Sequence, residues 1–333
     1  FAYGGADDEE EEDDESRYVL DSNILFELRE LIDEYKKGEF TESQLCSFID
    51  SLDPNTRDKY HHTALITGAY SQCPLAVQRL VENGAYVNAR DLHGMNALMK
   101  SVLNSDLESV EAMLQAPDIK VNSFQGKKGS KQSKTVLFAS LCGPTISVPV
   151  VMALLRAGAR LDDVHIQNHG QTSAFFIVAK AGKFKHFEPF EYMIEHHNNP
   201  KSRFKQDIPF DIIDSKGDNI ILHAARYPLP AKYWQLLLGK ATHAQRQYYN
   251  IVEKATVFTH LIKQYIDLVE KKTPQSEQKK NNVFEVARVL FNFSVFPSEN
   301  DIATAVGSKH CRDFGELLVR EGQAKKKSGL RSI

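Results

Sequence analysis

The sequence predicts an all-α fold, a solenoid built from stacked helix-turn-helix units. At a spacing of 33 residues, Asp58 aligns with Asp91 and Thr63 with Asn96, and the match extends over a whole unit. Between residues 64 and 81, apolar side chains recur at helical spacing in two short runs. Helices of this length are unstable alone in water, so each pair must bury its apolar faces against the next pair.

Glycines mark the end of each unit. Gly84-Ala85 follows the second apolar run of one unit, and Gly158-Ala159 follows the same run of a later one. A residue just past a helix end often needs the left-handed conformation that glycine adopts readily. Each unit therefore reads as helix, tight turn, helix and an extended polar connection.

The pattern resembles the ankyrin repeat. The clearest matches are GAYVNARDLHGMNAL at 84–98, VMALLRAGARLD at 151–162, NHGQTSAFF at 168–176 and DSKGDNIILHAA at 214–225. The proline that usually starts the first helix is absent throughout, and its place is taken by Ala64, Ala97, Val136, Ser173 and Ile221. Only His223 keeps the usual histidine. The spacing also drifts, which predicts inserted loops.

The chain divides by composition into five predicted segments. They are a disordered acidic tail at 1–17, an N-terminal cap of two amphipathic helices at 18–53, ankyrin repeats at 54–238 with insertions at 126–134 and 183–210, degenerate repeats or a separate helical domain at 239–322, and a basic tail at 323–333. The run DDEEEEDDE cannot bury a face, so it is a solubilising tail or an arm that contacts a basic partner or folds back on the basic body. Thr41 is placed as an N-cap in the cap helices, which could instead pair with a coiled-coil partner.

Composition favours an intracellular, cytoplasmic protein. The net charge is −3, 42% of residues are hydrophobic, and no apolar run approaches the roughly 18 residues of a membrane span. The four cysteines lie far apart in the sequence, which is typical of reduced, buried thiols and not of a disulfide framework. We expect neither a membrane span nor a secretory leader.

Few motifs point to catalysis, and we expect no cofactor and no metal. GKKGSK at 126–131 lacks the spacing of a phosphate-binding loop, and the adjacent histidines at 61–62 and 196–197 lack the spacing of zinc-binding helices. The strongest enzyme alternative is a cysteine nucleophile paired with a distant histidine, with Cys142 the best-exposed candidate. Nucleic-acid binding is not expected, because the lysines are scattered over loops and a tail.

Solenoids of this kind act by binding, and the resemblance implies that a partner contacts the connection tips and the outward positions of the first helices. Carried onto this sequence, the implied residues are Lys59, Tyr60, His62, Tyr70, Ser71, Arg90, Leu92, His93, Met95, Leu103 and Asn104. Leu103 could instead be buried. The insertion at 183–210 is a second candidate surface, or simply a lengthened helix and a solvated loop.

The sequence therefore predicts a monomeric, non-enzymatic scaffold that binds a partner protein through the concave ankyrin face. The alternative is an ankyrin-targeted enzyme, with a cysteine-protease-like or transferase activity in the helical part after residue 239. Degenerate repeats with uneven insertions also resemble the ankyrin effectors that intracellular bacteria deliver into host cells.

Overall fold

The structure is a computed structural model, which describes residues 18–125, 134–142, 146–160, 165–167, 170–172, 177, 188–196, 210–214, 216–227, 229–271, 275–322 and 324. The chain forms two compact units, Phe1–Ala153 (unit 1) and Leu154–Ile333 (unit 2). The predicted acidic tail lies outside the described residues, as do nearly all of the predicted insertion at 126–134 and of the basic tail. Of the predicted insertion at 183–210, only 188–196 and 210 are described.

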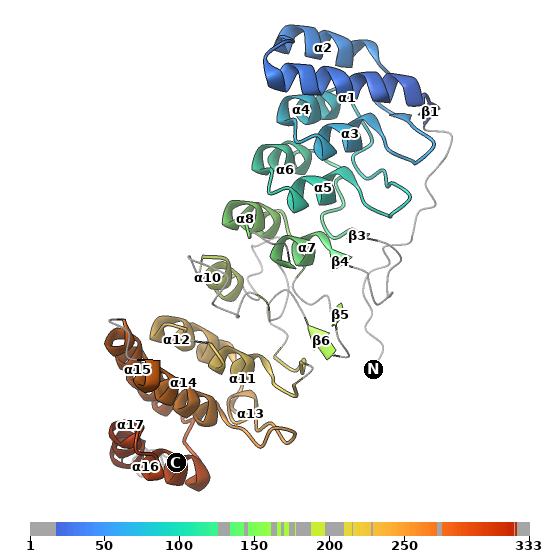
Figure 1. The fold of residues 1–333 in the computed structure, drawn as a ribbon. Helices are drawn as coiled ribbons and strands as arrows, with labels where there is room; N and C mark the ends of the chain where they lie inside the picture. Colours follow the sequence, from blue (N-terminus) through green and yellow to red (C-terminus); the bar gives the residue numbers. More distant parts are fainter. Residues whose placement is uncertain are drawn as a thin grey trace. The chain divides into compact units, whose positions relative to one another are not determined.

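Unit 1 is a stack of helix pairs (Figure 1). Its helices are α1 (Ser22–Lys37), α2 (Glu42–Ser51), α3 (Ala64–Tyr70), α4 (Pro74–Glu82), α5 (Ala97–Leu103), α6 (Leu107–Leu114) and α7 (Val136–Cys142), and α8 (Val148–Arg156) runs across the division between the units. Two short ladders accompany them: β1 (Val19–Leu20) pairs in parallel with β2 (Thr56–Arg57), and β3 (Phe124–Gln125) pairs antiparallel with β4 (Lys134–Thr135).

The helices of unit 1 form two rows. The first helices α1, α3, α5 and α7 contact one another in sequence, and α2, α4 and α6 do the same. The α1–α2 pair therefore packs on the α3–α4 pair as one repeat packs on the next. The buried side chains Leu28, Leu65 and Leu98 each lie on a first helix. This arrangement is the all-α, helix-turn-helix architecture that the repeat pattern predicts.

Side-chain caps fix where the helices begin. The Thr63 hydroxyl accepts a hydrogen bond from the backbone N–H of Ile66, and the Asn96 side chain accepts one from the N–H of Met99. The N-cap predicted at Thr41 is confirmed, and it forms a full capping box with Gln44. Such a cap satisfies an amide that the first helical turn leaves unpaired.

Asparagines tie each helix pair to the next. Asn55 Oδ1 accepts from the backbone N–H of Tyr86 at 2.9 Å. One repeat later, Asn88 Oδ1 accepts from the N–H of Lys120 at 2.8 Å, and its Nδ2 donates to the carbonyl of Asp118 at 2.8 Å. These bonds pair backbone groups in the joints, where no helix or sheet would satisfy them.

Unit 2 also consists of paired helices. Its described elements are β5 (His165–Gln167), β6 (Gly170–Thr172), α10 (Glu188–Glu195), α11 (Ile220–Ala225), α12 (Ala231–Lys240), α13 (His243–Arg246), α14 (Val257–Lys271), α15 (Ser276–Asn292), α16 (Glu299–Gly307), α17 (Arg312–Leu317) and the π-helical η3 (Leu318–Gly322). Strands β5 and β6 pair antiparallel. Helices α11, α14 and α16 pack in sequence, as do α10, α12 and α15, so two rows recur here as well.

A hairpin precedes α14, where a repeat would have its connection. The backbone groups of Asn250 and Ala255 bond to each other in both directions, at 3.0 and 3.1 Å. Thr256 then caps α14 by accepting from the N–H of Thr259. Asn250 takes the place of Asp58 and Asp91 in the earlier connections, and Thr256 takes the place of the capping residues Thr63 and Asn96. One more residue separates the two positions here.

Candidate functional site

The connections of unit 1 are tight hairpins whose tips face solvent. Asp58 Oδ1 accepts from the backbone N–H groups of Tyr60 and His62 at 2.7 and 2.9 Å. Asp91 Oδ1 accepts from those of His93 and Met95 at 2.8 and 2.9 Å. An aspartate that bonds its own backbone two and four residues on fixes the turn, so the tip residues are held in place.

The two tips touch and present an apolar patch. The backbone N–H of Leu92 donates to the carbonyl of Tyr60 at 3.3 Å. The side chains of Tyr60 and Leu92 remain 53% and 60% exposed. Lys59 Nζ lies 5.0 Å from the centre of the Tyr60 ring, within the range of a cation–π contact.

A second patch lies on the first helices. Tyr70 on α3 and Leu103 on α5 occupy equivalent positions and both are exposed. Leu103, whose burial the sequence left open, is 45% exposed. Arg29 of α1 and Lys100 of α5 lie over the Tyr70 ring, with Arg29 Cζ at 5.7 Å and Lys100 Nζ at 5.9 Å from its centre.

The implied partner-binding residues thus gather in these two patches. Those at the tips are Lys59, Tyr60, His62, Arg90, Leu92, His93 and Met95, and those at the helices are Tyr70, Ser71, Leu103 and Asn104. Four of them, His62, Ser71, Arg90 and Met95, are only half-exposed. His62 also has a structural role, because its Nδ1 and Nε2 lie 3.3 Å from an Asp58 oxygen and 3.9 Å from an Asp91 oxygen.

The sequence reasoning missed Phe26 on α1, a largely exposed aromatic side chain. The buried stripe of α1 consists of Leu25, Leu28 and Ile32. Phe26 points away from that stripe. An aromatic residue outside the buried stripe of an amphipathic helix was the sequence signal that could have identified it. Phe26 and Arg29 are three residues apart and share a face of α1, so Phe26 extends the patch that Arg29 forms with Tyr70.

Three of the four cysteines, Cys46, Cys73 and Cys311, have an environment that disfavours a thiolate nucleophile. Burial raises the pKa of the Cys73 thiol, and burial together with Asp313 raises that of Cys311 to about 12. Burial likewise raises the pKa of Cys46, although Arg79 opposes the shift. A reactive cysteine needs a lowered pKa. Cys142 is half-buried at the end of α7, and the residues that follow it lie outside the described part of the chain.

Neither a metal-binding cluster nor a membrane-spanning helix occurs among the described residues. Within them, no three His, Cys, Asp or Glu side chains converge closely enough to hold a metal ion. In the same part of the chain, no helix combines the length and the apolar character needed to cross a bilayer.

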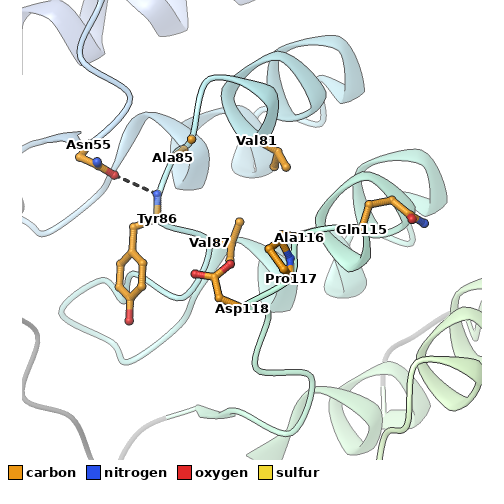
Figure 2. A pocket seen from close by; sticks show the side chains of 10 residues that line it. Asn55, Val81, Ala85, Tyr86, Val87, Gln115, Ala116, Pro117 and Asp118 are labelled. Atoms are coloured by element: carbon orange, nitrogen blue, oxygen red, sulfur yellow. Dashed lines mark hydrogen bonds between the residues drawn. The ribbon is translucent and has the colours of Figure 1, made fainter. Parts of the chain in front are cut away.

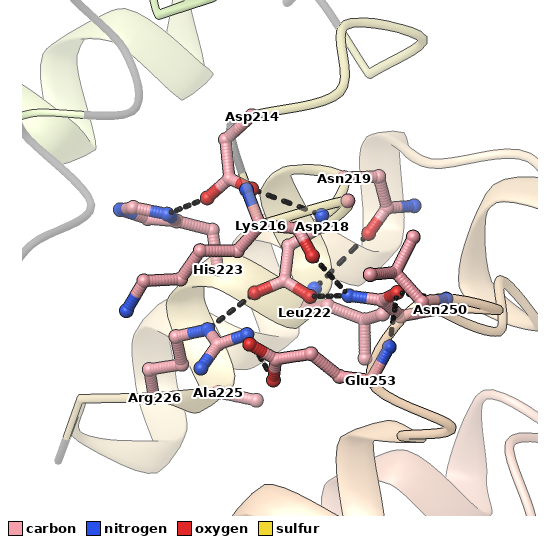
Figure 3. Close-up of polar contacts among 12 residues, drawn as sticks. Asp214, Lys216, Asp218, Asn219, Leu222, His223, Ala225, Arg226, Asn250 and Glu253 are labelled. Atoms are coloured by element: carbon pink, nitrogen blue, oxygen red, sulfur yellow. Dashed lines mark hydrogen bonds and ion pairs between the residues drawn. The ribbon is translucent and has the colours of Figure 1, made fainter. Parts of the chain in front are cut away.

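Unit 2 has a polar cluster around its own connection (Figure 3). Asp214 repeats the turn of the earlier aspartates by accepting from the N–H groups of Lys216 and Asp218, and its second oxygen lies 2.8 Å from His223 Nδ1. Asp218 pairs with Arg226, which also bonds Glu253 at 2.7 Å. The Asp214–His223 pair therefore anchors the turn to α11.

A cleft of about 630 Å³ opens in unit 1 where the second helices α4 and α6 end (Figure 2). Its apolar lining comes from Val81, Ala85, Val87, Ala116 and Pro117, and Asn55, Gly84, Tyr86, Gln115 and Asp118 complete it. The cleft shares no lining residue with the two patches described above.

Comparisons with known proteins give only distant similarities. No protein-family model matches the chain, and no curated protein sequence matches it either. The structure is similar to that of the human ASB11 ankyrin repeat domain, with a TM-score of 0.47, 14% identity and coverage of 81% of this chain and 99% of that one. It is also similar to the ankyrin repeat domain of Bcl-3, a member of the IkappaB family, with a TM-score of 0.46, 15% identity and coverage of 72% and 93%. By their own geometry, with capped helix pairs and aspartate-centred hairpins, both units have the all-α helix-turn-helix architecture of the ankyrin type.

Proposed function

We propose that the protein is a non-enzymatic scaffold that binds a partner protein through the tip patch and the first-helix patch of unit 1. The observation that carries the proposal is the exposed pair Tyr60 and Leu92, held rigidly on adjacent hairpins. Large apolar side chains that are fixed before binding supply anchors at low entropic cost. The cations Lys59 and Arg29 beside the exposed rings favour a partner surface that carries carboxylates as well as apolar groups.

The experiment is quantitative affinity capture with the full chain and two sets of variants. The test variant carries Tyr60→Ala, Tyr70→Ala and Leu92→Ala. The matched control carries Gln78→Ala and Glu111→Ala, which are exposed positions on the second helices α4 and α6. We expect the test variant to lose its partner by at least about tenfold, the scale of one truncated anchor, while the control retains it. Equal capture by all three proteins would overturn the proposal.

We further propose that residues 239–322 are enlarged repeats and not a separate catalytic domain. The hairpin at 250–255, the cap at Thr256 and the stacking of α14 on α11 support this assignment. The raised pKa of Cys311 speaks against a thiol nucleophile in this region. Loss of the α14–α15 pair on deletion of 250–292 should therefore destabilise α11–α12, whereas an independent domain would leave them folded.

Delivery into a host cell and a cytoplasmic location there remain part of the proposal. Their support is the uneven spacing of the degenerate repeats, which resembles bacterial ankyrin effectors. A translocation reporter fused to the full chain would test delivery, since a signal confined to the producing bacterium would contradict it.

A further inference from the structure

The hairpin at 250–255 carries the most exposed large apolar side chains of the described residues. Ile251 and Val252 lie at its tip and are 81% and 80% exposed. Neither is needed for packing in unit 2. Two adjacent aliphatic side chains that protrude from a hairpin form a knob, which can insert into an apolar cleft.

The base of this knob is rigidly braced. Asn250 is fully buried, and its Nδ2 donates to the carbonyl of Lys216 at 2.8 Å and to Asp218 Oδ1 at 2.7 Å. Its Oδ1 accepts from the N–H groups of Val252 and Glu253 at 2.9 and 3.0 Å. The shape of the knob is therefore fixed before it binds, which reduces the entropic cost of association.

A glycine completes the brace, together with the ion pair between Arg226 and Glu253 that Figure 3 shows. Gly217 has φ of 83°, and a Cβ there would meet Asn250 Oδ1 at 2.9 Å, so the close approach requires glycine. Glu253 is held by Arg226 at 2.7 Å. The lysines that flank the knob, Lys216 and Lys254, are exposed, and no ion pair with a described carboxylate is recorded for either.

A lipid surface is a poor match for the knob. Its two side chains offer only about seven carbons, roughly half of a single myristoyl chain, which itself gives only marginal membrane binding. An apolar cleft on a protein can bind the knob without a larger apolar area, because the cleft surrounds the two side chains.

The cleft of unit 1 has the chemistry that this knob requires (Figure 2). Its apolar lining includes Val81, Ala85 and Pro117, and its volume of about 630 Å³ exceeds that of two aliphatic side chains. Asp118 at its rim is exposed, and no ion pair with a described cation is recorded for it. Unit 1 also has more Asp and Glu than Lys and Arg, whereas unit 2 has the reverse excess, so the charges are complementary.

We propose that the Ile251–Val252 knob of one copy docks into the unit 1 cleft of a second copy, with Lys216 or Lys254 beside Asp118. The contact joins two different surfaces, so each copy retains a free knob or a free cleft, and association continues into chains or rings. Weak self-association then replaces the monomer that the sequence leads us to expect. The inference is independent of the proposed partner site, because it uses none of the residues of the two patches.

Sedimentation velocity on the full chain tests the contact. Between about 5 and about 500 µM, the range in which weak contacts become populated, the average sedimentation coefficient of the native protein should rise. It should stay constant for Ile251→Ser/Val252→Ser. Tyr60→Ser/Leu92→Ser removes another exposed apolar pair, in unit 1, and should behave like the native protein. A constant value for the native protein, or a rise that survives loss of the knob, would overturn the proposal.

Mixing complementary variants gives the sharper result. Ile251→Ser/Val252→Ser keeps the cleft, whereas Ala116→Arg blocks the cleft and keeps the knob. Each alone should be monomeric, and the mixture should give a one-to-one dimer that grows no further. Asp118→Lys serves as a second cleft variant if circular dichroism shows that Ala116→Arg misfolds. Lack of a dimer in either mixture contradicts the docking. If the native protein does not self-associate but binds anionic vesicles through the knob, the ligand of the knob is a lipid surface and the docking proposal is wrong.

Discussion

His61 and Gly94 occupy equivalent positions in successive connections, and both adopt a left-handed backbone conformation, with φ of 63° and 69°. The conformation is strained for any residue with a Cβ, by about 1–2 kcal/mol, and nearly free for glycine. His61→Gly should therefore stabilise the protein, by about 0.5–1 kcal/mol after the greater entropy of glycine in the unfolded chain is subtracted. Urea denaturation measures the change, and Gly94→Ala is the reciprocal control that should lower the midpoint. A lower midpoint for His61→Gly would contradict the strain argument.

Acid should weaken unit 2 through His260. Burial, assisted by the nearby Arg226, lowers its pKa from 6.5 to about 4. The unfolded chain therefore takes up a proton as the pH falls below about 6.5, while the folded protein does so only near 4. The contribution of His260 to the free energy of unfolding is fully present above pH 6.5. It declines as the pH falls from 6.5 to 4, by at most about 3 kcal/mol. Free energies of unfolding measured across this range should show a shallower decline for His260→Gln, and parallel curves would refute the assignment.

Lys100 should be needed to keep the Asp91 carboxylate ionised in the second connection. The Asp91 side chain is fully buried, and its Oδ2 lies 2.9 Å from Lys100 Nζ. Burial alone would raise the pKa of Asp91, but the bonds from Met95 and Lys100 lower it overall. Lys100→Met leaves a buried charge without its cation and should cost about 3–5 kcal/mol. Lys37→Met, which removes an exposed lysine at the end of α1, should change stability by less than about 0.5 kcal/mol. Equal losses would show that the pairing is unimportant.

Asn250→Ala should loosen the unit 2 hairpin. The substitution removes the acceptor of two backbone N–H groups and the donor to Lys216 and Asp218. Hydrogen exchange at Val252 and Glu253 should accelerate by at least about tenfold, in line with about 1–3 kcal/mol for each polar group left unpaired in the interior. Asn104→Ala removes one hydrogen bond of 3.3 Å, from the C-cap of α5 to the carbonyl of Ala69. It should leave hydrogen exchange in the unit 2 hairpin unchanged.

Much of unit 1 could be predicted because its first two repeats keep the period of 33. The aspartate, the capping residue and the apolar stripes recur at fixed offsets, so Asp91 and Asn96 indicated the connection and the helix start that the structure contains. Whether the implied residues bind a partner stays a prediction, because exposure alone does not identify a ligand.

The hairpin of unit 2 escaped the sequence reasoning for physical reasons. Asn250 replaces the usual aspartate, the turn is one residue longer, and Lys254 takes the left-handed position without a glycine, at φ of 52°. Each change is small in energy, yet together they remove the aspartate, the spacing and the glycine by which the earlier connections can be identified in the sequence. Nothing in the sequence marks the adjacent aliphatic residues Ile251 and Val252 as exposed, and only the fold reveals that they face solvent.

The asparagine hydrogen bonds between neighbouring helix pairs of unit 1 affect how the repeats unfold. Asn55 satisfies an amide near Tyr86, and Asn88 satisfies groups near Lys120 and Asp118. A helix pair that opens therefore leaves polar groups of its neighbour without partners, which lowers the cost of opening that neighbour as well. Such nearest-neighbour coupling makes unfolding cooperative, so that damage at one joint spreads along the stack instead of staying local.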